Sequence, residues 1–455
     1  MTPRRLVLLS AVVIVLFAFI LLFERKTPST SERQSKGELH WDLPEERVEE
    51  IRLEQSGTVI ELKKGEGETW RLVRPASYPA DSVAVAELTR ELGDLKRSGG
   101  GQAADARPEE YGLVPPVVKA TVTWTEEKEP GKKQSRSIEL GLDIPGTDVT
   151  AARLSGAPSV VFVPTSVGAA IKKSADDFKS KDVFGGSALD VSRLDAERGR
   201  GELVLVKKGS VWWLEKPLAD LADSEAAERL VSALTGLRVL AFLPSSPGED
   251  LAARGLDPPL HRVTLTATNG KKTTVDFGAT RSDGNSVYAR REGQDFTVES
   301  EIVEDLSKEA VALRSPSVLK FDRGDVSAVG GSFGGTSYAL DREDGGWTLL
   351  GKPVIASAAD DLLSAILDLK SRSFLGEADV RGLRSQEPTA KIFVTLSPRD
   401  RWEVSFWPMP GGIGAAVSRR PGAFLLPADA VGNLEATLRK AAASPVATPA
   451  ATPKK

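Results

Sequence analysis

One long segment occurs three times in this chain, and that repetition constrains the fold more than any other feature. A tryptophan followed within a few residues by proline occurs at Trp70, Trp213 and Trp347, with spacings of 143 and 134 residues. A Gly-Leu pair also occurs three times, at Gly112, Gly255 and Gly382, with spacings of 143 and 127 residues. Because two independent markers give nearly the same period, the sequence predicts three tandem copies of one folding module.

Each copy combines an amphipathic helix between its two markers with a series of short alternating strands. The helices place leucine or isoleucine at i, i+4 and i+7, on one helix face. These sets are Leu88/Leu92/Leu95, Leu230/Leu234/Leu237 and Leu362/Ile366/Leu369. We expect Asp81, Asp223 and Ser357 to cap the helices. Glycine, asparagine and aspartate turns join neighbouring strands, which favours antiparallel pairing. The predicted unit is ββαββββα, with one strand before each tryptophan, and the fold class is α+β.

An uncharged apolar stretch, residues 6–23, precedes the repeats. As a helix it would span about 27 Å, which matches the hydrocarbon core of a membrane and exceeds the apolar region of a typical signal peptide. We therefore expect an uncleaved anchor, with the amino terminus in the cytoplasm because positive charge slightly favours that side. The expected organisation is a transmembrane anchor over 1–26, a tether over 27–42, repeats over 43–187, 188–318 and 319–440, and a disordered tail over 441–455.

Cysteine content and charge exclude several classes of function. The chain has no cysteine and two histidines, His40 and His261, so disulfide frameworks, thiol catalysis and Cys/His zinc sites are excluded. The 60 Lys and Arg residues nearly balance the 64 Asp and Glu residues, and they form no basic block. Nucleic acid is therefore not an expected partner.

Short motifs with catalytic counterparts all fit a structural interpretation better. Residues 330–334 match the G-x-S-x-G nucleophile elbow, but neither histidine lies downstream of Ser332, so we expect a hairpin turn there. Ser317 and Lys320 have serine–lysine spacing without the partner motifs S-D-N and K-T-G. The glycine-rich stretches lack the phosphate-loop pattern, and the acidic run over 341–345 lacks calcium-loop spacing. The sequence predicts no catalytic, metal-binding or cofactor-binding residue and no cofactor, so we expect a protein that is not an enzyme.

Two tryptophans are the candidates for a binding surface. We interpret Trp213 as the repeated core residue, so its neighbour Trp212 is expected on the opposite face of the strand. Trp407 lies on the face of its strand, 401–407, that is opposite the apolar side chains. An outward Trp212 or Trp407 would contact a protein partner or stack on a sugar. The alternative for both is packing under a loop.

Four segments carry a resemblance to a known family. They are the YPAD run at Tyr78–Asp81, the YGLxPP run at Tyr111–Pro116, the D-F-G strand at Asp276–Gly278, and the segment Leu313–Phe321. These segments resemble a bacterial repeat family that is catalogued only as a domain of unknown function. The resemblance covers most of residues 43–440. It implies membrane anchoring and genes that often lie beside gliding-motility-type ABC transporter components. The third copy departs from the pattern, because Arg384, Ser385 and Gln386 interrupt its turn and Trp407 replaces a strand glycine.

The expected function follows from the anchor, the repeats and the resemblance. We expect a single-pass protein of the inner (cytoplasmic) membrane, held there by residues 6–23, with the bulk of the chain extracytoplasmic (periplasmic). It would be a non-enzymatic scaffold or accessory subunit whose protein partners belong to an ABC-transporter or cell-envelope (gliding-type) assembly. Two alternatives stay open: an envelope glycan- or ligand-binding protein, and a carboxylate-dependent hydrolase, because spatial pairing of carboxylates is invisible in one sequence.

Overall fold

The chain divides into two compact units. The structure, a computed structural model, describes residues 43–95, 107–127, 131–155, 159–199, 201–244, 251–343, 346–397 and 400–443. The first unit comprises residues 1–181 with 242–245 and 292–295, and the second comprises the rest. The predicted anchor over 6–23, the tether over 27–42 and most of the tail over 441–455 lie outside the described residues. Within the described ranges, no helix is both long and apolar enough to cross a membrane.

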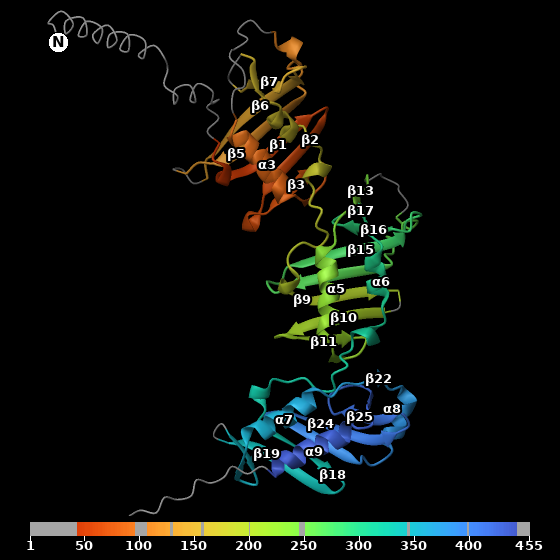
Figure 1. The fold of residues 1–455 in the computed structure, drawn as a ribbon. Helices are drawn as coiled ribbons and strands as arrows, with labels where there is room; N and C mark the ends of the chain where they lie inside the picture. The colour runs from red at the N-terminus through yellow and green to blue at the C-terminus, as the bar shows by residue number, and fades with distance from the viewer. Residues whose placement is uncertain are drawn as a thin grey trace, which may run out of the picture. The chain divides into compact units, whose positions relative to one another are not determined.

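Three antiparallel sheets follow one another along the chain and share one strand order (Figure 1). The first consists of β1 (Val48–Gln55), β2 (Thr58–Lys64), β3 (Trp70–Arg74), β4 (Tyr78–Pro79), β5 (Val118–Thr125), β6 (Lys133–Asp143), β7 (Val149–Leu154) and β8 (Val161–Pro164). Its order is β4-β3-β2-β1-β5-β6-β7-β8, so β1 pairs with β2 on one side and with β5 on the other. Helix α3 (Ser82–Gly93) therefore leads from the edge strand β4 back to the middle of the sheet, and α4 (Thr165–Ile171) follows the last strand.

The second and third sheets repeat this order and add one short strand at an edge. The second repeat consists of β9 (Val191–Arg198), β10 (Gly201–Lys208), β11 (Val211–Lys216), β12 (Asp220–Leu221), α5 (Ser224–Gly236), β13 (Ala241–Phe242), β14 (His261–Ala267), β15 (Lys272–Thr280), β16 (Ser286–Arg291), β17 (Gln294–Glu299) and α6 (Glu301–Ser307). The expected α+β class, with repeated antiparallel sheets, is confirmed by this shared order.

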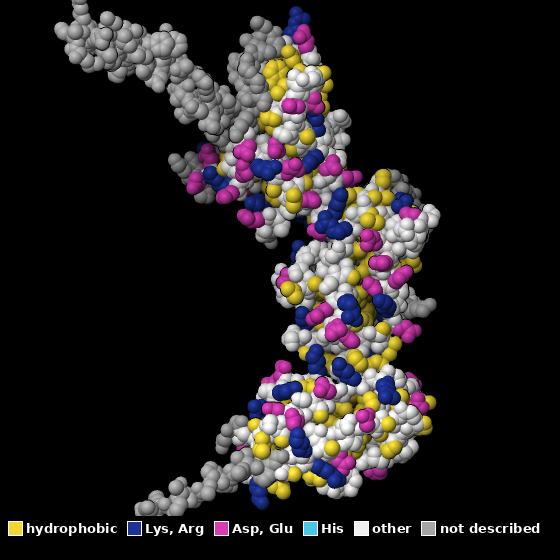
Figure 2. All heavy atoms as spheres, in the orientation of Figure 1, with side chains coloured by type: hydrophobic (Ala, Val, Ile, Leu, Met, Phe, Trp, Pro, Cys, Tyr) yellow, Lys and Arg dark blue, Asp and Glu magenta, His cyan; other side chains and the backbone are white. Residues whose placement is uncertain are grey.

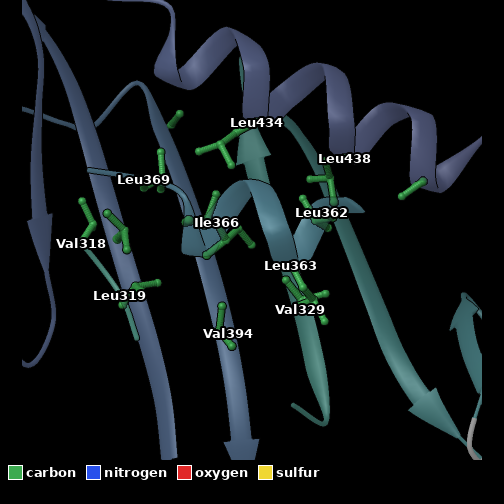
Figure 3. Packing of buried hydrophobic residues seen from close by; sticks show 14 of the residues in the cluster. Val318, Leu319, Val329, Leu362, Leu363, Ile366, Leu369, Val394, Leu434 and Leu438 are labelled. Carbon is green, nitrogen blue, oxygen red and sulfur yellow. The ribbon is translucent and has the colours of Figure 1, made fainter. Parts of the chain in front are cut away.

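Within the described residues, the third repeat has one more α-helix than each of the other two. It consists of β18 (Ala328–Phe333), β19 (Thr336–Glu343), β20 (Gly346–Leu349), β21 (Lys352–Val354), α7 (Ala356–Leu367), β22 (Ser373–Phe374), α8 (Glu377–Arg384), β23 (Ala390–Ser397), β24 (Asp400–Met409), β25 (Gly412–Val417), β26 (Phe424–Leu426) and α9 (Ala430–Ala442). Its core lies between the sheet and the two helices α7 and α9, as Figure 3 shows. Leu362 and Ile366 of α7 and Leu438 of α9 are buried there against Val394 of β23.

The predicted helices form, and two of the three predicted caps are confirmed. All nine residues of the predicted apolar seams are buried. The Asp81 carboxylate accepts hydrogen bonds from the backbone N–H groups of Val83 and Ala84, and Asp223 accepts one from Ala226. The predicted cap at Ser357 is wrong, because α7 begins at Ala356 and Ser357 lies inside the helix. The cap residue is Ile355, whose side chain has no hydrogen-bond acceptor.

The prediction of a single strand before each tryptophan is wrong, because each repeat has an antiparallel hairpin there: β1–β2, β9–β10 and β18–β19. In the first repeat the turn consists of Ser56 and Gly57, both at positive φ, which is the geometry of a two-residue hairpin. The predicted hairpin at the G-x-S-x-G motif is confirmed, but its turn is Gly334–Gly335, so Ser332 lies within β18. The acidic run ends β19 at Glu343, and β20 follows from Gly346 as its antiparallel partner.

The Gly-Leu turn depends on a glycine in a neighbouring strand. Gly112 and Gly255 both adopt φ 66°, in the left-handed region that favours glycine. A Cβ on Gly141 of β6 would lie 2.0 Å from the carbonyl oxygen of Tyr111, and one on Gly278 of β15 would lie 2.1 Å from that of Arg254. Only a residue without a side chain therefore lets the turn pack onto the strand.

The third repeat has Trp407 where the other two have this strand glycine, and its Gly-Leu pair behaves differently. Gly382 lies inside α8, so the prediction that this pair repeats the turn is wrong. The Trp407 side chain packs against Leu383 of α8 and Ala423. Its Nε1 donates a hydrogen bond to the carbonyl oxygen of Gln386 at 3.0 Å. The large ring thus fills the space that the turn occupies in the first two repeats, and a short helix covers it.

Opposite charges are mixed over the surface. Dark blue and magenta side chains are interspersed on the face that Figure 2 shows. Several pairs bridge neighbouring strands: Arg262 of β14 lies opposite Asp276 of β15, with Nε and Oδ1 2.7 Å apart, and Arg153 of β7 lies opposite Glu139 of β6. Exposed pairs such as Arg262–Asp276 contribute about 0–1 kcal/mol each, so the sheets owe their stability mainly to the apolar cores.

Candidate functional site

The expectation that Trp212 faces outward is wrong. Its side chain is 0% exposed, and Lys207 Nζ lies 5.7 Å from the centre of its ring. Its neighbour Trp213 is on the opposite face of β11, where Lys208 Nζ lies 5.6 Å from its ring. The repeated core tryptophan is therefore Trp212 rather than Trp213.

Strand pairing explains why Trp212, and not the next residue Trp213, is equivalent to Trp70 of the first repeat. Leu72 of β3 lies opposite Tyr78 of β4, and Leu214 of β11 lies opposite Asp220 of β12. These pairs occupy the same place in the two sheets, and the residue two positions before each leucine is Trp70 in one repeat and Trp212 in the other.

The expectation of an outward Trp407 is wrong as well. Its side chain is 6% exposed, because α8 covers it in the arrangement described above. Both candidate tryptophans are therefore packing residues, which is the alternative that the sequence left open. The candidate surface for a partner lies elsewhere in the described part of the chain.

An arginine of each later repeat holds the segment that leads into that repeat. Arg291 Nη1 donates a hydrogen bond to the carbonyl oxygen of Val183 at 2.7 Å, just before the second sheet. Arg420 Nη1 donates to the carbonyl oxygen of Val318 at 3.1 Å, and its Nη2 donates to that of Ser315 at 3.1 Å, just before the third sheet. Each arginine stands two residues before the positive-φ glycine of the last hairpin in its repeat. We call Arg291 and Arg420 the linker arginines.

Arg420 also belongs to a buried charge cluster within the second compact unit. Its Nε lies 2.6 Å from Oδ1 of Asp220, and Arg314 Nε lies 2.7 Å from Oδ2 of the same carboxylate. The side chains of Asp220, Arg420 and Arg314 are 0%, 1% and 10% exposed. Burial lowers the pKa of the Arg420 guanidinium, while its hydrogen bond to Asp220 opposes that change. Because Asp220 belongs to the second repeat and Arg420 to the third, this cluster fixes the two repeats to each other.

The candidate partner-binding surface is on the third repeat, around the turn between β20 and β21. Leu350 in this turn is 91% exposed and adopts φ 50°. A side chain in the left-handed region costs about 1–2 kcal/mol, and leucine has no short polar group to offset that cost. The local fold therefore disfavours leucine at this position, and its exposed side chain gains almost no packing energy in return.

A hollow with an accessible volume of about 420 Å³ lies beside Leu350. Its lining includes Tyr338, Phe393 and Arg401. The guanidinium carbon of Arg401 lies 3.9 Å from the centre of the Phe393 ring, a close cation–π stack. Gly330 makes room for this ring, because a Cβ there would lie 2.7 Å from Phe393. No carboxylate pairs with Arg401 among the described residues, so its guanidinium is available to a partner.

These features have the chemistry of a protein-binding surface. Energetically dominant residues at interfaces are enriched in aromatic side chains and arginine, and they lie in pockets that exclude water on binding. We call Leu350, Phe393 and Arg401 the docking residues. The sequence does not predict them, because Phe393 and Arg401 belong to two strands, and leucine is rarely found at positive φ. The Leu-Gly pair at 350–351 between two short strands is the one local signal.

Two comparisons bear on the family. A family model described as a domain of unknown function (DUF4340) matches the chain twice, over residues 70–250 and 243–388. No curated protein matches the sequence. Two successive matches agree with an architecture that repeats along the chain.

Proposed function

The chain belongs to the DUF4340 family, a domain of unknown function, and on that premise we propose that it is a non-enzymatic scaffold or accessory subunit. In this proposal residues 6–23 anchor it in the inner membrane, and the repeats lie on the extracytoplasmic side. Its partner is a protein of an ABC-transporter or other cell-envelope assembly. The resemblance to a membrane-anchored repeat family supports this class of partner, because it implies genes that lie beside transporter components.

The observation that carries the proposal is the exposed Leu350 at positive φ beside the Arg401–Phe393 stack. Backbone conformations that cost stability cluster at binding and switch positions, and Leu350 combines such a conformation with a place beside the hollow. The matching partner surface has an apolar pocket for Leu350 and a carboxylate for the guanidinium of Arg401, because paired burial satisfies both groups.

By contrast, residues in equivalent places of different repeats act in packing. Trp70, Trp212 and Trp347 are core or partly buried residues, and Gly141 and Gly278 admit a turn. Repetition of packing residues supports a modular scaffold. The glycan-binding alternative relied on an outward Trp212 or Trp407, so their burial removes its support, and we advance neither it nor the hydrolase alternative.

Crosslinking in intact membranes tests the proposal. A photoreactive amino acid at position 350 of the full chain is expected to form a covalent product with a transporter or envelope protein, identified by mass spectrometry. The matched control position is Leu189 of the second repeat, which is 82% exposed. No discrete product is expected there. Equal products at both positions, or none at 350, would contradict the proposed surface.

Substitution of the docking residues gives a second measure. Asn tolerates the left-handed conformation, so Leu350→Asn keeps the turn while it removes the apolar contact. The double variant Leu350→Asn/Arg401→Gln is expected to weaken co-purification of the partner identified by crosslinking by about tenfold or more, as for central interface residues. Leu189→Asn is expected to leave co-purification unchanged, and an equal loss in this control would argue against the docking residues.

A further inference from the structure

The second repeat contains a pocket of about 580 Å³ at the end of β9, far in sequence from the docking residues. It lies between the end of β9, the start of β10, the start of β14 and the segment that follows α6. Its polar lining consists of Arg198, Glu202, His261, Ser307, Lys308 and Glu309. We call it the Arg198 pocket.

Arg198 brings a positive charge into this pocket, where its hydrogen-bond partners among the described residues are main-chain carbonyl groups. Its Nη1 donates hydrogen bonds to the carbonyl oxygens of Leu306 at 3.0 Å and Lys308 at 2.7 Å. No carboxylate lies within ion-pair distance of it among the described residues. Burial alone lowers the pKa of the Arg198 guanidinium. A partly dehydrated cation that bonds only to neutral carbonyls is stabilised when an anion approaches its remaining N–H groups.

His261 lies directly opposite Arg198 in the sheet and also lines the pocket. Its Nδ1 is buried and has no hydrogen-bond partner among the described residues. Because an unpaired buried N–H is rarer than an unpaired acceptor, we assign the ring proton to Nε2. Burial and then the charge of Arg198 lower the pKa of His261, so the ring is neutral at pH 7. Nε2 is then the nitrogen that donates a hydrogen bond.

The first repeat shows that the fold does not require this pair. Gln55 and Val118 are paired at the corresponding positions of β1 and β5. Gln55 Nε2 donates a hydrogen bond to the carbonyl oxygen of Lys173, just after α4. Arg198 makes the equivalent hydrogen bond in the second repeat, to the carbonyl oxygen of Lys308 just after α6. Val118 is fully buried. A neutral amide and an aliphatic side chain therefore satisfy the same structural role, and the guanidinium and imidazole of the second repeat are additional chemistry.

We propose that the Arg198 pocket binds the anionic group of a small molecule, a phosphate or a carboxylate. The unused N–H groups of Arg198 and the Nε2–H of His261 donate to the anion, and Lys308 adds positive charge at the rim. Of the two acidic residues in the lining, Glu202 is already paired with Lys216. Glu309 is exposed at the rim and opposes binding by repulsion.

The experiment uses the histidine signals of the full chain in detergent micelles. The sequence has two histidines, so ring-labelled protein gives separate NMR signals for His40 and His261. Inorganic phosphate and acetate are titrated separately, with sodium chloride at matched ionic strength as the control. We expect a saturable shift of the His261 signal, with a rise in its pKa because a nearby negative charge favours the imidazolium. The anion that saturates at the lower concentration identifies the class of ligand.

Two variants make the result specific. Arg198→Gln copies Gln55 of the first repeat, so it is expected to fold, and it is expected to weaken anion binding by about tenfold or more. Glu309→Gln removes the repulsion and is expected to tighten binding. The proposal is overturned if neither anion gives saturation, if His40 shifts in parallel with His261, or if Arg198→Gln binds as tightly as the unmodified chain.

Discussion

Replacing Asp220 with alanine is expected to destabilise the second compact unit by about 3–5 kcal/mol. The substitution leaves Arg314 and Arg420 without their shared carboxylate, and both guanidinium groups are almost fully buried. Carbonyl groups still accept hydrogen bonds from Arg420, but they carry no charge to balance it. Pulse proteolysis of the full chain in increasing urea measures the loss as a lower unfolding midpoint.

An exposed ion pair provides the control for this prediction. Asp276→Ala removes the cross-strand partner of Arg262 and is expected to cost at most about 1 kcal/mol, since water solvates the remaining arginine. Replacing Asp220, Arg314 and Arg420 together with leucine or methionine removes the unpaired charges but leaves the carbonyl oxygens of Ser315 and Val318 without their donor, so it is expected to recover only part of the lost stability. If Asp220→Ala costs no more than Asp276→Ala, the charge cluster does not connect the two repeats as described.

Gly278→Ala is expected to lower stability by about 3 kcal/mol, the upper range for overpacking a well-filled site. The new Cβ would lie 2.1 Å from the carbonyl oxygen of Arg254 and 3.1 Å from the side chain of Leu256. Because the first contact is with backbone, the whole Gly-Leu turn has to move away from β15. Hydrogen exchange with mass spectrometry should then show faster exchange in this turn as well as a lower urea midpoint.

The matched substitution is Gly236→Ala at the end of α5. Among the described residues, no atom outside its own stretch of helix lies within 4 Å of the added Cβ. Alanine is the better helix former by about 1 kcal/mol, so this variant is expected to be as stable as the unmodified chain or slightly more stable. A similar loss in both glycine variants would mean that the close approach of Arg254 to β15 does not limit the choice of residue.

Features that depend on local periodicity are predictable from this sequence. The apolar seams of the three helices and two of their caps are confirmed, because i, i+4, i+7 spacing fixes a helix face whatever packs against it. The pair Trp212–Trp213 is different. Either residue fits an alternating pattern, and only the pairing of Leu214 with Asp220 across the strands decides which one is buried.

The candidate sites depend on contacts between residues distant in sequence, which explains why sequence reasoning missed them. Arg401 stacks on Phe393 across neighbouring strands, and the hollow beside them involves Leu350, about 50 residues earlier. Arg198 and His261 are opposite each other only because β14 returns to the middle of the sheet. No pattern within a single strand predicts either arrangement.

The linker arginines have a consequence for how such a chain can grow. Arg153 of the first repeat lies opposite Glu139, and Arg290 of the second lies opposite Asp276, so the two arginines are in equivalent places. The residue after each is Leu154 in the first repeat and the linker arginine Arg291 in the second. Each downstream copy thus carries the arginine that binds the incoming peptide, while the preceding copy supplies main-chain carbonyl groups and, for Arg420, the carboxylate of Asp220. A copy added at the carboxyl-terminal end by gene duplication would therefore carry its own linker arginine, and a buried arginine such as Arg420 also needs a carboxylate in the copy before it.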